Sequence, residues 1–245
     1  MTSQLSKFVD IHTHILPGLD DGPKNIEESL ALARCFVRTG IKIVIATPHF
    51  LPGTAWASSK EKVLEAVQAL QMSLDKEKIN LKVEAGMEIA FHKRLEERLL
   101  SGDLLSLWDS GFFLIEPSFH GEQEGMLSSL ESLLRRGEKL ILAHPERVDN
   151  FQQKPELLER LVGQGLLIQV NMGSLLGYFG AKSQETAELL SQNNWLHFIA
   201  SDAHNHDKRA PLNEDEWAAF LGRPEGEDIF SSCTSNIAKQ FLQNH

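Results

Sequence analysis

The sequence contains little of what several common protein classes require. Only two cysteines, Cys35 and Cys233, occur in 245 residues, too few for a disulfide framework and not spaced as a zinc pair. The sequence has no apolar run of about 18 residues that could span a bilayer. The first thirty residues are acidic and show no signal-peptide pattern. We therefore expect a cytoplasmic protein without membrane insertion.

Basic residues are scarce as well. The chain has 24 Lys and Arg against 34 Asp and Glu, which gives a formal net charge of -10. Nucleic-acid binding depends on clustered Lys and Arg that neutralise phosphates, so no nucleic-acid partner is expected. The acidic excess is compatible with a site that holds several cations.

Three catalytic signatures are also missing. No Gly-rich phosphate loop follows an early strand, which argues against a nucleotide-binding open sheet. A thiol phosphatase needs an Arg six positions after its Cys, but Ile41 and Lys239 stand there. No serine lies in a Gly-X-Ser-X-Gly context. Cysteine and serine nucleophiles are therefore not supported.

What the sequence does contain is a regular alternation of short apolar runs and helical patterns. Strands are expected at 8–12, 42–46, 81–89, 112–116, 139–143, 166–170 and 196–200. Helices are expected from Asn25 to Gly40, from Ser59, near 93–100, 125–136, 155–163 and 183–192, and after 213.

Strands that alternate with helices indicate a parallel sheet, and runs as apolar as KIVIA and KLILA predict strands covered on both faces. Seven such units close most naturally into a (β/α)7 barrel, one unit fewer than usual; an open doubly wound sheet is the alternative. No linker or repeat interrupts the alternation, so residues 1–245 are expected to form a single domain.

Potential metal ligands gather where the predicted strands end. Five of the ten histidines do so, together with three acids and an aspartate of the DDG turn: His12, His14, His49, His144, His204, Glu88, Glu116, Asp202, and Asp20 or Asp21. The carboxyl ends of barrel strands meet at one face, where the chemistry of barrel enzymes sits. Mixed His and carboxylate ligands without Cys favour Mn, Fe or Zn, and nine ligands suffice for two or three ions.

Two arginines follow these strand ends. Arg147 comes three residues after His144, and Arg209 five after His204, where each can reach a substrate anion. Neighbouring divalent ions hold a bridging hydroxide that can attack phosphorus in line, so phosphoester hydrolysis is predicted. A small-molecule phosphatase for histidinol phosphate or a related ester, a metal-binding regulatory module without turnover, and an amidohydrolase are the alternatives.

The motifs DIHTHILPGLDDGP, ATPHF, GMEI, LIEPS, AHPER and SDAHN, in this order, resemble the polymerase and histidinol phosphatase (PHP) superfamily. More closely, they resemble the manganese-dependent protein tyrosine phosphatases of bacterial capsule and exopolysaccharide loci. The resemblance runs from about Phe8 to Arg209. It implies a distorted (β/α)7 barrel that dephosphorylates the tyrosine-rich tail of a cognate bacterial tyrosine kinase.

The resemblance also implies a site with three divalent ions, most often Mn, with Fe or Zn as alternatives. The first ion would be held by His12, His14, Glu88 and Asp202, the second by Glu88, Glu116 and His144, and the third by Asp21, His49 and His204. Asp21 is chosen over Asp20 because the family ligand directly precedes the glycine. The phosphate-binding arginines of the family fall on Arg147 and Arg209.

Aromatic residues near these motifs are candidates for the mouth of the site: Phe50, Trp56, Phe119 and His120. The metal chemistry does not dictate them, and packing within loops is the more common role of such residues.

Overall fold

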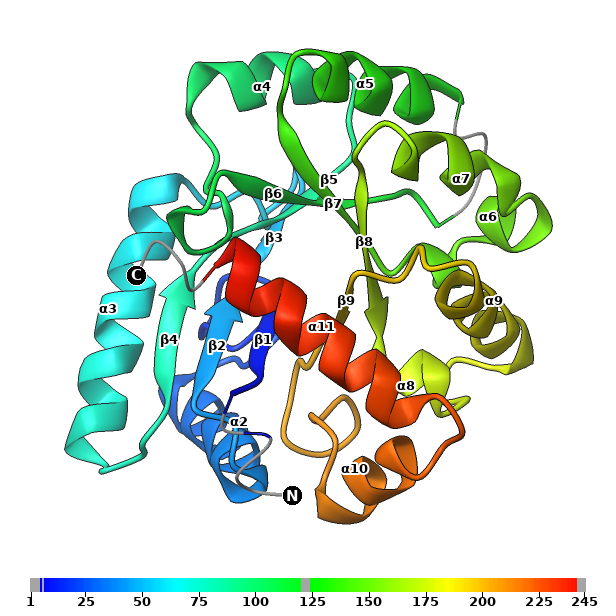
Figure 1. Ribbon diagram of the computed structural model, residues 1–245. Coiled ribbons are helices and arrows are strands. Elements are labelled where there is room, and N and C mark those ends of the chain that lie inside the picture. Colours follow the sequence, from blue (N-terminus) through cyan, green and yellow to red (C-terminus); the bar gives the residue numbers. More distant parts are fainter. Residues whose placement is uncertain (1–4, 6, 120–123, 242–245) are drawn as a thin grey trace.

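The computed structural model describes residue 5, residues 7–119 and residues 124–241. Its strands are β1 (Val9–Thr13), β2 (Ile43–Ala46), β3 (His49–Phe50), β4 (Lys82–Ala85), β5 (Glu88–Ala90), β6 (Phe112–Glu116), β7 (Lys139–Ala143), β8 (Leu167–Asn171) and β9 (Phe198–Ala200). Its longer helices are α2 (Ile26–Thr39), α3 (Lys60–Lys76), α4 (Leu95–Ser101), α5 (Glu124–Arg135), α7 (Glu156–Val162), α9 (Ala181–Gln192), α10 (Glu214–Leu221) and α11 (Gly226–Gln240). The strands lie at the centre and the helices around them (Figure 1).

The strands form one parallel ring. Their order is β1-β2-β4 in one sheet and β3-β5-β6-β7-β8-β9 in the other. Strands β2 and β3 are two parts of one interrupted barrel strand, and so are β4 and β5. The nine strands therefore correspond to seven passes of the chain through the barrel wall. A parallel bridge between Thr13 and Ala203 joins the last pass to the first. The predicted distorted (β/α)7 barrel is confirmed.

The prediction of one continuous strand over 81–89 is wrong, because this pass is broken between β4 and β5. At Gly86 an added Cβ would lie 2.8 Å from Leu107 Cδ2 and 3.0 Å from Ile45 Cγ2. A side chain at this position would therefore require the Leu107 and Ile45 side chains to shift. After the break β5 pairs with β3 and β6, which places Glu88 at the start of a strand rather than near its end.

The expected N-cap and C-cap residues are present at α2. The side chain of Asn25 accepts a hydrogen bond from the Glu28 backbone N–H, and Gly40 has a left-handed φ of 98°. Two short helices, α6 (Asp149–Gln153) and α8 (Met172–Leu175), were not predicted, because four or five residues are too few for a periodic signal.

The C-terminal helix α11 closes the amino end of the barrel. The Phe241 ring, next to its last turn, lies 6.1 Å from Phe112 and 5.8 Å from Phe198, the first residues of β6 and β9. Figure 1 shows α11 crossing in front of the strands. The carboxyl ends of the strands therefore lie at the opposite face. Among the described residues, no helix is both long and apolar enough to cross a membrane.

Candidate metal centre

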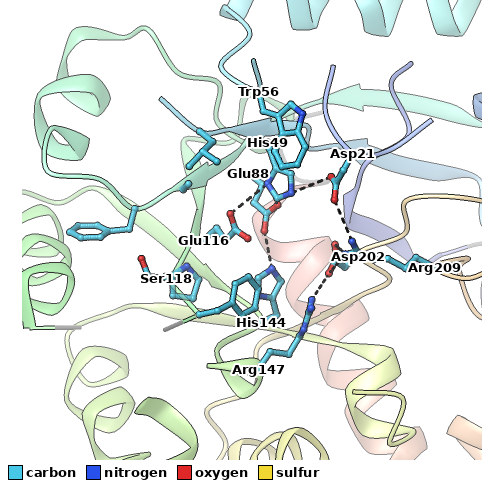
Figure 2. A pocket seen from close by; sticks show the side chains of 15 residues that line it. Asp21, His49, Trp56, Glu88, Glu116, Ser118, His144, Arg147, Asp202 and Arg209 are labelled. Carbon is cyan, nitrogen blue, oxygen red and sulfur yellow. Dashed lines mark hydrogen bonds and ion pairs between the residues drawn. The ribbon is translucent and has the colours of Figure 1, made fainter. Parts of the chain in front are cut away.

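All nine predicted ligands lie close together at the carboxyl end of the barrel. They come from β1 and its loop (His12, His14, Asp21), from β3 and β5 (His49, Glu88), from the ends of β6 and β7 (Glu116, His144) and from the loop after β9 (Asp202, His204). Figure 2 shows Glu88, Glu116, His144 and Asp202 facing a common space. The structure thus brings together side chains separated by as much as 192 positions in the chain.

His12 and His14 point the same way, as their spacing predicts. Their Nε2 atoms are 3.2 Å apart and both rings are fully buried. His12 Nδ1 donates to Gln169 Oε1 at 2.9 Å, and His14 Nδ1 donates to Asp20 Oδ2 at 2.7 Å. When both rings are neutral, the two Nε2 lone pairs face each other, an arrangement that a cation bound between them would stabilise.

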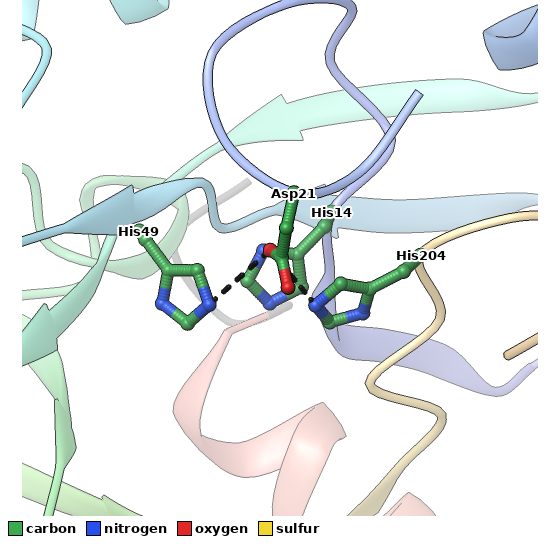
Figure 3. Close-up of side chains that lie close together, drawn as sticks. All are labelled: His14, Asp21, His49 and His204. Carbon is green, nitrogen blue, oxygen red and sulfur yellow. Dashed lines mark ion pairs between the residues drawn. The ribbon is translucent and has the colours of Figure 1, made fainter. Parts of the chain in front are cut away.

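A second pair of facing acceptors lies between His204 and Asp21. His204 Nδ1 donates to the Asp202 carbonyl at 2.9 Å, and its Nε2 then faces Asp21 Oδ1 at 3.2 Å. The same carboxylate oxygen lies 3.4 Å from His49 Nε2, so that Asp21 stands between two imidazoles (Figure 3). The geometry therefore favours Asp21, rather than Asp20, as the acid of the DDG turn that belongs to the cluster.

Glu88 is the centre of the cluster. One of its oxygens, Oε1, lies 3.3 Å from His12 Nε2 and 2.9 Å from His144 Nε2. The other, Oε2, lies 3.2 Å from His14 Nε2 and 2.9 Å from His49 Nδ1. A fully buried carboxylate between four imidazoles is placed to bridge ions on either side.

The groups of neighbouring ligand atoms in the structure share more residues with one another than do the three ligand sets that the resemblance implies. Ligand atoms within 4.8 Å of one another form four groups: His14, Asp21, His49 and His204; His12, Glu88 and His144; His12, His14 and Asp202; and His49, Glu88 and Glu116. Two of the implied sets are recognisable in these groups. Glu116, however, lies beside His49, with Oε2 3.5 Å from His49 Nδ1, rather than with His144.

The electrostatics of the cluster fit bound cations. Burial and the neighbouring Glu88 carboxylate raise the pKa of Glu116 to about 8. Burial opposes ionisation of Glu88 too, but positive charge on His12 and His49 holds its pKa well below the usual value. Burial lowers the pKa of His144, which keeps that ring neutral and able to ligate. Divalent ions would neutralise the crowded carboxylates.

The two predicted arginines both contact Asp202. Arg147 Nη1 lies 2.9 Å from Asp202 Oδ2, and Arg209 Nη2 lies 3.2 and 3.1 Å from the two oxygens. Arg209 Nη1 also lies 3.6 Å from Asp21 Oδ2. Each guanidinium has five N–H groups, so both keep donors for a substrate anion. Both side chains line the same cavity as the metal cluster (Figure 2).

This cavity has a volume of about 360 Å³. Its polar lining consists of six cluster residues, Ser118 and the two arginines: Asp21, His49, Glu88, Glu116, Ser118, His144, Arg147, Asp202 and Arg209. Its apolar lining is Leu51, Trp56, Ala90, Phe91, Pro117 and Phe119. Of the predicted mouth residues, Trp56 and Phe119 thus line the cavity. Phe50 is 6% exposed and belongs to the core, and His120 lies outside the described residues.

Two of the candidate ligands have left-handed backbone conformations. His144 has a φ of 33° and Asp202 a φ of 53°. Such residues cost about 1–3 kcal/mol each and persist where the surroundings hold them, often at functional sites. Here the N–H of His144 donates to the Gln169 carbonyl at 2.8 Å, and that of Asp202 to the His12 carbonyl at 3.0 Å. Both bonds run to neighbouring strands of the barrel.

The sequence did not predict which residues support the cluster. Asp20 was a candidate ligand but instead holds His14, Gln169 holds His12, and Asn171 Nδ2 donates to Asp202 Oδ2 at 2.8 Å. Glu146, inside the AHPER motif, accepts bonds from Ser174 Oγ at 2.6 Å and from the Asn171 N–H at 3.1 Å. Burial raises the pKa of Glu146 to about 7. Gln169 and Asn171 are two positions apart on β8 and so lie on the same face. Two polar side chains on one face of an otherwise apolar strand were the sequence signal for this supporting role.

A family model described as capsular polysaccharide synthesis, CpsB/CapC, matches residues 8–243. The chain belongs to this family. The tyrosine-protein phosphatase YwqE of Bacillus subtilis (strain 168) is 39% identical over 237 residues, which cover 97% of this chain and 92% of YwqE. The tyrosine-protein phosphatase CpsB of Streptococcus pneumoniae is 29% identical over 231 residues, or 91% of this chain and 95% of CpsB.

Solved structures agree with this membership of the CpsB/CapC family. One of these structures comes from work on YwqE of Bacillus subtilis and CpsB of Streptococcus pneumoniae, which are described as unique metal-dependent tyrosine phosphatases. It superposes on this chain with a TM-score of 0.88 at 34% identity, and the match covers 96% of this chain and 94% of the other. The predicted family and enzyme class are confirmed by these relatives. Histidinol phosphate phosphatase from Lactococcus lactis shares only the fold, with a TM-score of 0.57 at 12% identity, covering 95% and 94% of the two chains.

Within this family member, replacing Asp20 by Asn should weaken metal binding without removing a candidate ligand. Asp20 Oδ2 accepts from His14 Nδ1 and from the His49 N–H at 3.0 Å, while Oδ1 accepts from the Gly22 N–H at 2.9 Å. An amide accepts at only one end and carries no charge, so either His14 or the turn at Gly22 loses its acceptor, and His14 loses the neighbouring negative charge in both cases. We expect metal affinity to fall about 10–100-fold.

The measurement is the manganese concentration that gives half-maximal phosphatase activity. Asp75→Asn, at an exposed position of α3 outside the cluster, is the matched control and should leave this concentration unchanged. An unaltered manganese requirement in Asp20→Asn would show that His14 needs no such anchor.

Proposed function

We propose that this chain hydrolyses phosphotyrosine on a protein substrate, using three divalent cations held by the nine clustered side chains. Manganese is the metal that we favour, and the whole chain acts as one catalytic domain. The proposal depends chiefly on one observation: six members of the cluster line the same cavity as Arg147 and Arg209, namely Asp21, His49, Glu88, Glu116, His144 and Asp202. Metal ligands and phosphate-binding cations thus line one space.

The ligand roles follow from the contacts. His12, His14 and Asp202 form one group, and Asp21, His49 and His204 form another that shares His14. Glu116 and His144 complete the set beside Glu88. When bound, divalent ions would lower the pKa of a water molecule and so supply a nucleophile near neutral pH.

The protein's own part in the reaction is to bind and orient the phosphoryl group. The donors of Arg147 and Arg209 that do not contact Asp202 would bind its equatorial oxygens and stabilise the negative charge that develops there. A phenolate is a good leaving group, so the reaction requires less help from a general acid than an alkyl ester does. The substrate that we propose is the tyrosine-phosphorylated tail of a bacterial kinase in capsule or exopolysaccharide synthesis, because the family is one of capsular polysaccharide synthesis.

The test is phosphate release by protein stripped of metal with a chelator. Phosphotyrosine peptide, phosphoserine peptide and histidinol phosphate are compared, each with and without added manganese. We expect no turnover without metal, and restored turnover with manganese that favours the phosphotyrosine peptide. Turnover of histidinol phosphate alone would instead assign a small-molecule phosphatase. Bound metal without any turnover would assign a regulatory module.

A further inference from the structure

An exposed tryptophan lies at the mouth of the cavity. Trp56 is 37% exposed, although a large aromatic ring is normally stabilised by burial. Its indole stacks on His49, with ring centroids 5.6 Å apart and an interplanar angle of 14°. Because His49 is a candidate ligand, the indole lies directly beside the metal cluster.

The loop that carries Trp56 is held by its own hydrogen bonds. The Leu51 N–H donates to the Trp56 carbonyl at 2.7 Å, and the Trp56 N–H donates to Thr54 Oγ1 at 3.0 Å. Phe50 and Ala57 form an antiparallel bridge across the base of the loop. The indole is therefore presented at the mouth by an ordered turn, which reduces the entropy lost when a ligand packs on it.

The cavity is polarised around the cluster. Trp56 and Leu51 both line it, and Figure 2 shows Trp56 and Arg147 on opposite sides of the space that contains Glu88 and His144. A phosphate at the cluster would therefore have the Arg147 guanidinium on one side and the indole on the other. Phe119 is already engaged, since its ring stacks on His144 at 5.5 Å and lies 5.1 Å from the Arg147 guanidinium.

We infer that Trp56 is the residue that selects aryl phosphates, because the phenyl ring of the substrate packs on its indole and on Leu51. This inference rests on the proposed function. Glu88 lines the cavity and is fully buried, so a phosphate beside it would lie at the floor. The phenyl ring of the substrate would then extend toward the mouth, where the indole lies. The one-carbon side chain of phosphoserine would leave the indole without a partner.

The experiment measures kcat/KM of the manganese-loaded enzyme for phenyl phosphate, phosphotyrosine peptide and an alkyl phosphate. It compares wild type with Trp56→Ala, Trp56→Phe and, as a matched exposed apolar control on α3, Leu64→Ala. Comparing each variant with wild type on the same substrate cancels the intrinsic reactivity of the ester.

We expect Trp56→Ala to lower kcat/KM for both aryl substrates by about 10–100-fold, the effect of losing the burial and stacking of one aromatic ring. The alkyl phosphate, the manganese content and inhibition by inorganic phosphate should be unchanged. Trp56→Phe should retain most of the aryl activity, and Leu64→Ala all of it.

Equal losses on aryl and alkyl substrates would overturn the inference, because Trp56 would then act only by holding His49. Unchanged aryl activity in Trp56→Ala would overturn it as well. If wild type itself shows no preference for phosphotyrosine, the proposed function fails. An aryl preference in wild type that survives in Trp56→Ala leaves the proposed function intact and refutes only the role of Trp56.

Discussion

Replacing Glu88 by Gln is expected to lower kcat by at least about 10³-fold, because even the loss of a residue that only supports a ligand costs about 10–100-fold. The Glu88 carboxylate lies within 3.3 Å of four imidazoles, and no other acid of the cluster contacts as many. Glutamine preserves the volume but removes the negative charge and one acceptor. The ions on either side of residue 88 would then lose their shared ligand.

The measurement is kcat at saturating manganese, together with the manganese content of the purified protein. Glu84→Gln, four residues earlier on the same pass of the barrel but outside the cluster, serves as the control and should keep activity close to that of wild type. If Glu88→Gln retained both metal and turnover, Glu88 would be a structural acid, and the proposed bridging role would be wrong.

The fold was largely predictable because the sequence patterns that indicate its strands and helices depend on residues close together in the chain. Short apolar runs and helix caps such as Asn25 and Gly40 are set by neighbouring residues, and parallel strands imply a closed layer of helices. The broken third pass was not predictable. The backbone at Gly86 passes close to the side chains of Leu107 and Ile45, which are 21 and 41 positions away, and a single sequence carries no record of such contacts.

The candidate site was predictable for a different reason. Ligand-type residues at strand ends must converge because the barrel brings those ends together. The supporting residues are harder to predict, since Asp20, Gln169 and Glu146 act through hydrogen bonds whose partners lie elsewhere in the chain. The arginines were predicted as phosphate ligands, but nothing in their spacing indicated that both would also contact Asp202.

Arg147→Lys tests the part of the site that recognises phosphate, and we expect kcat/KM to fall by about 10²–10³-fold, the typical cost of losing one preorganised donor at a developing negative charge. The Arg147 guanidinium lies 5.1 Å from the centroid of the Phe119 ring and 4.3 Å from that of the Phe179 ring, and it donates to Asp202. Lysine keeps the charge but loses the planar group that contacts these rings and the fork that binds two oxygens.

Three readouts separate phosphate binding from support of the metal cluster. If Arg147 binds phosphate, the inhibition constant for inorganic phosphate should rise along with the loss in kcat/KM, while manganese content stays at the wild-type level. If Arg147 instead serves mainly to hold Asp202, manganese content should fall and added manganese should restore turnover. Arg160→Lys, on the exposed side of α7, is the matched control and should change none of the three.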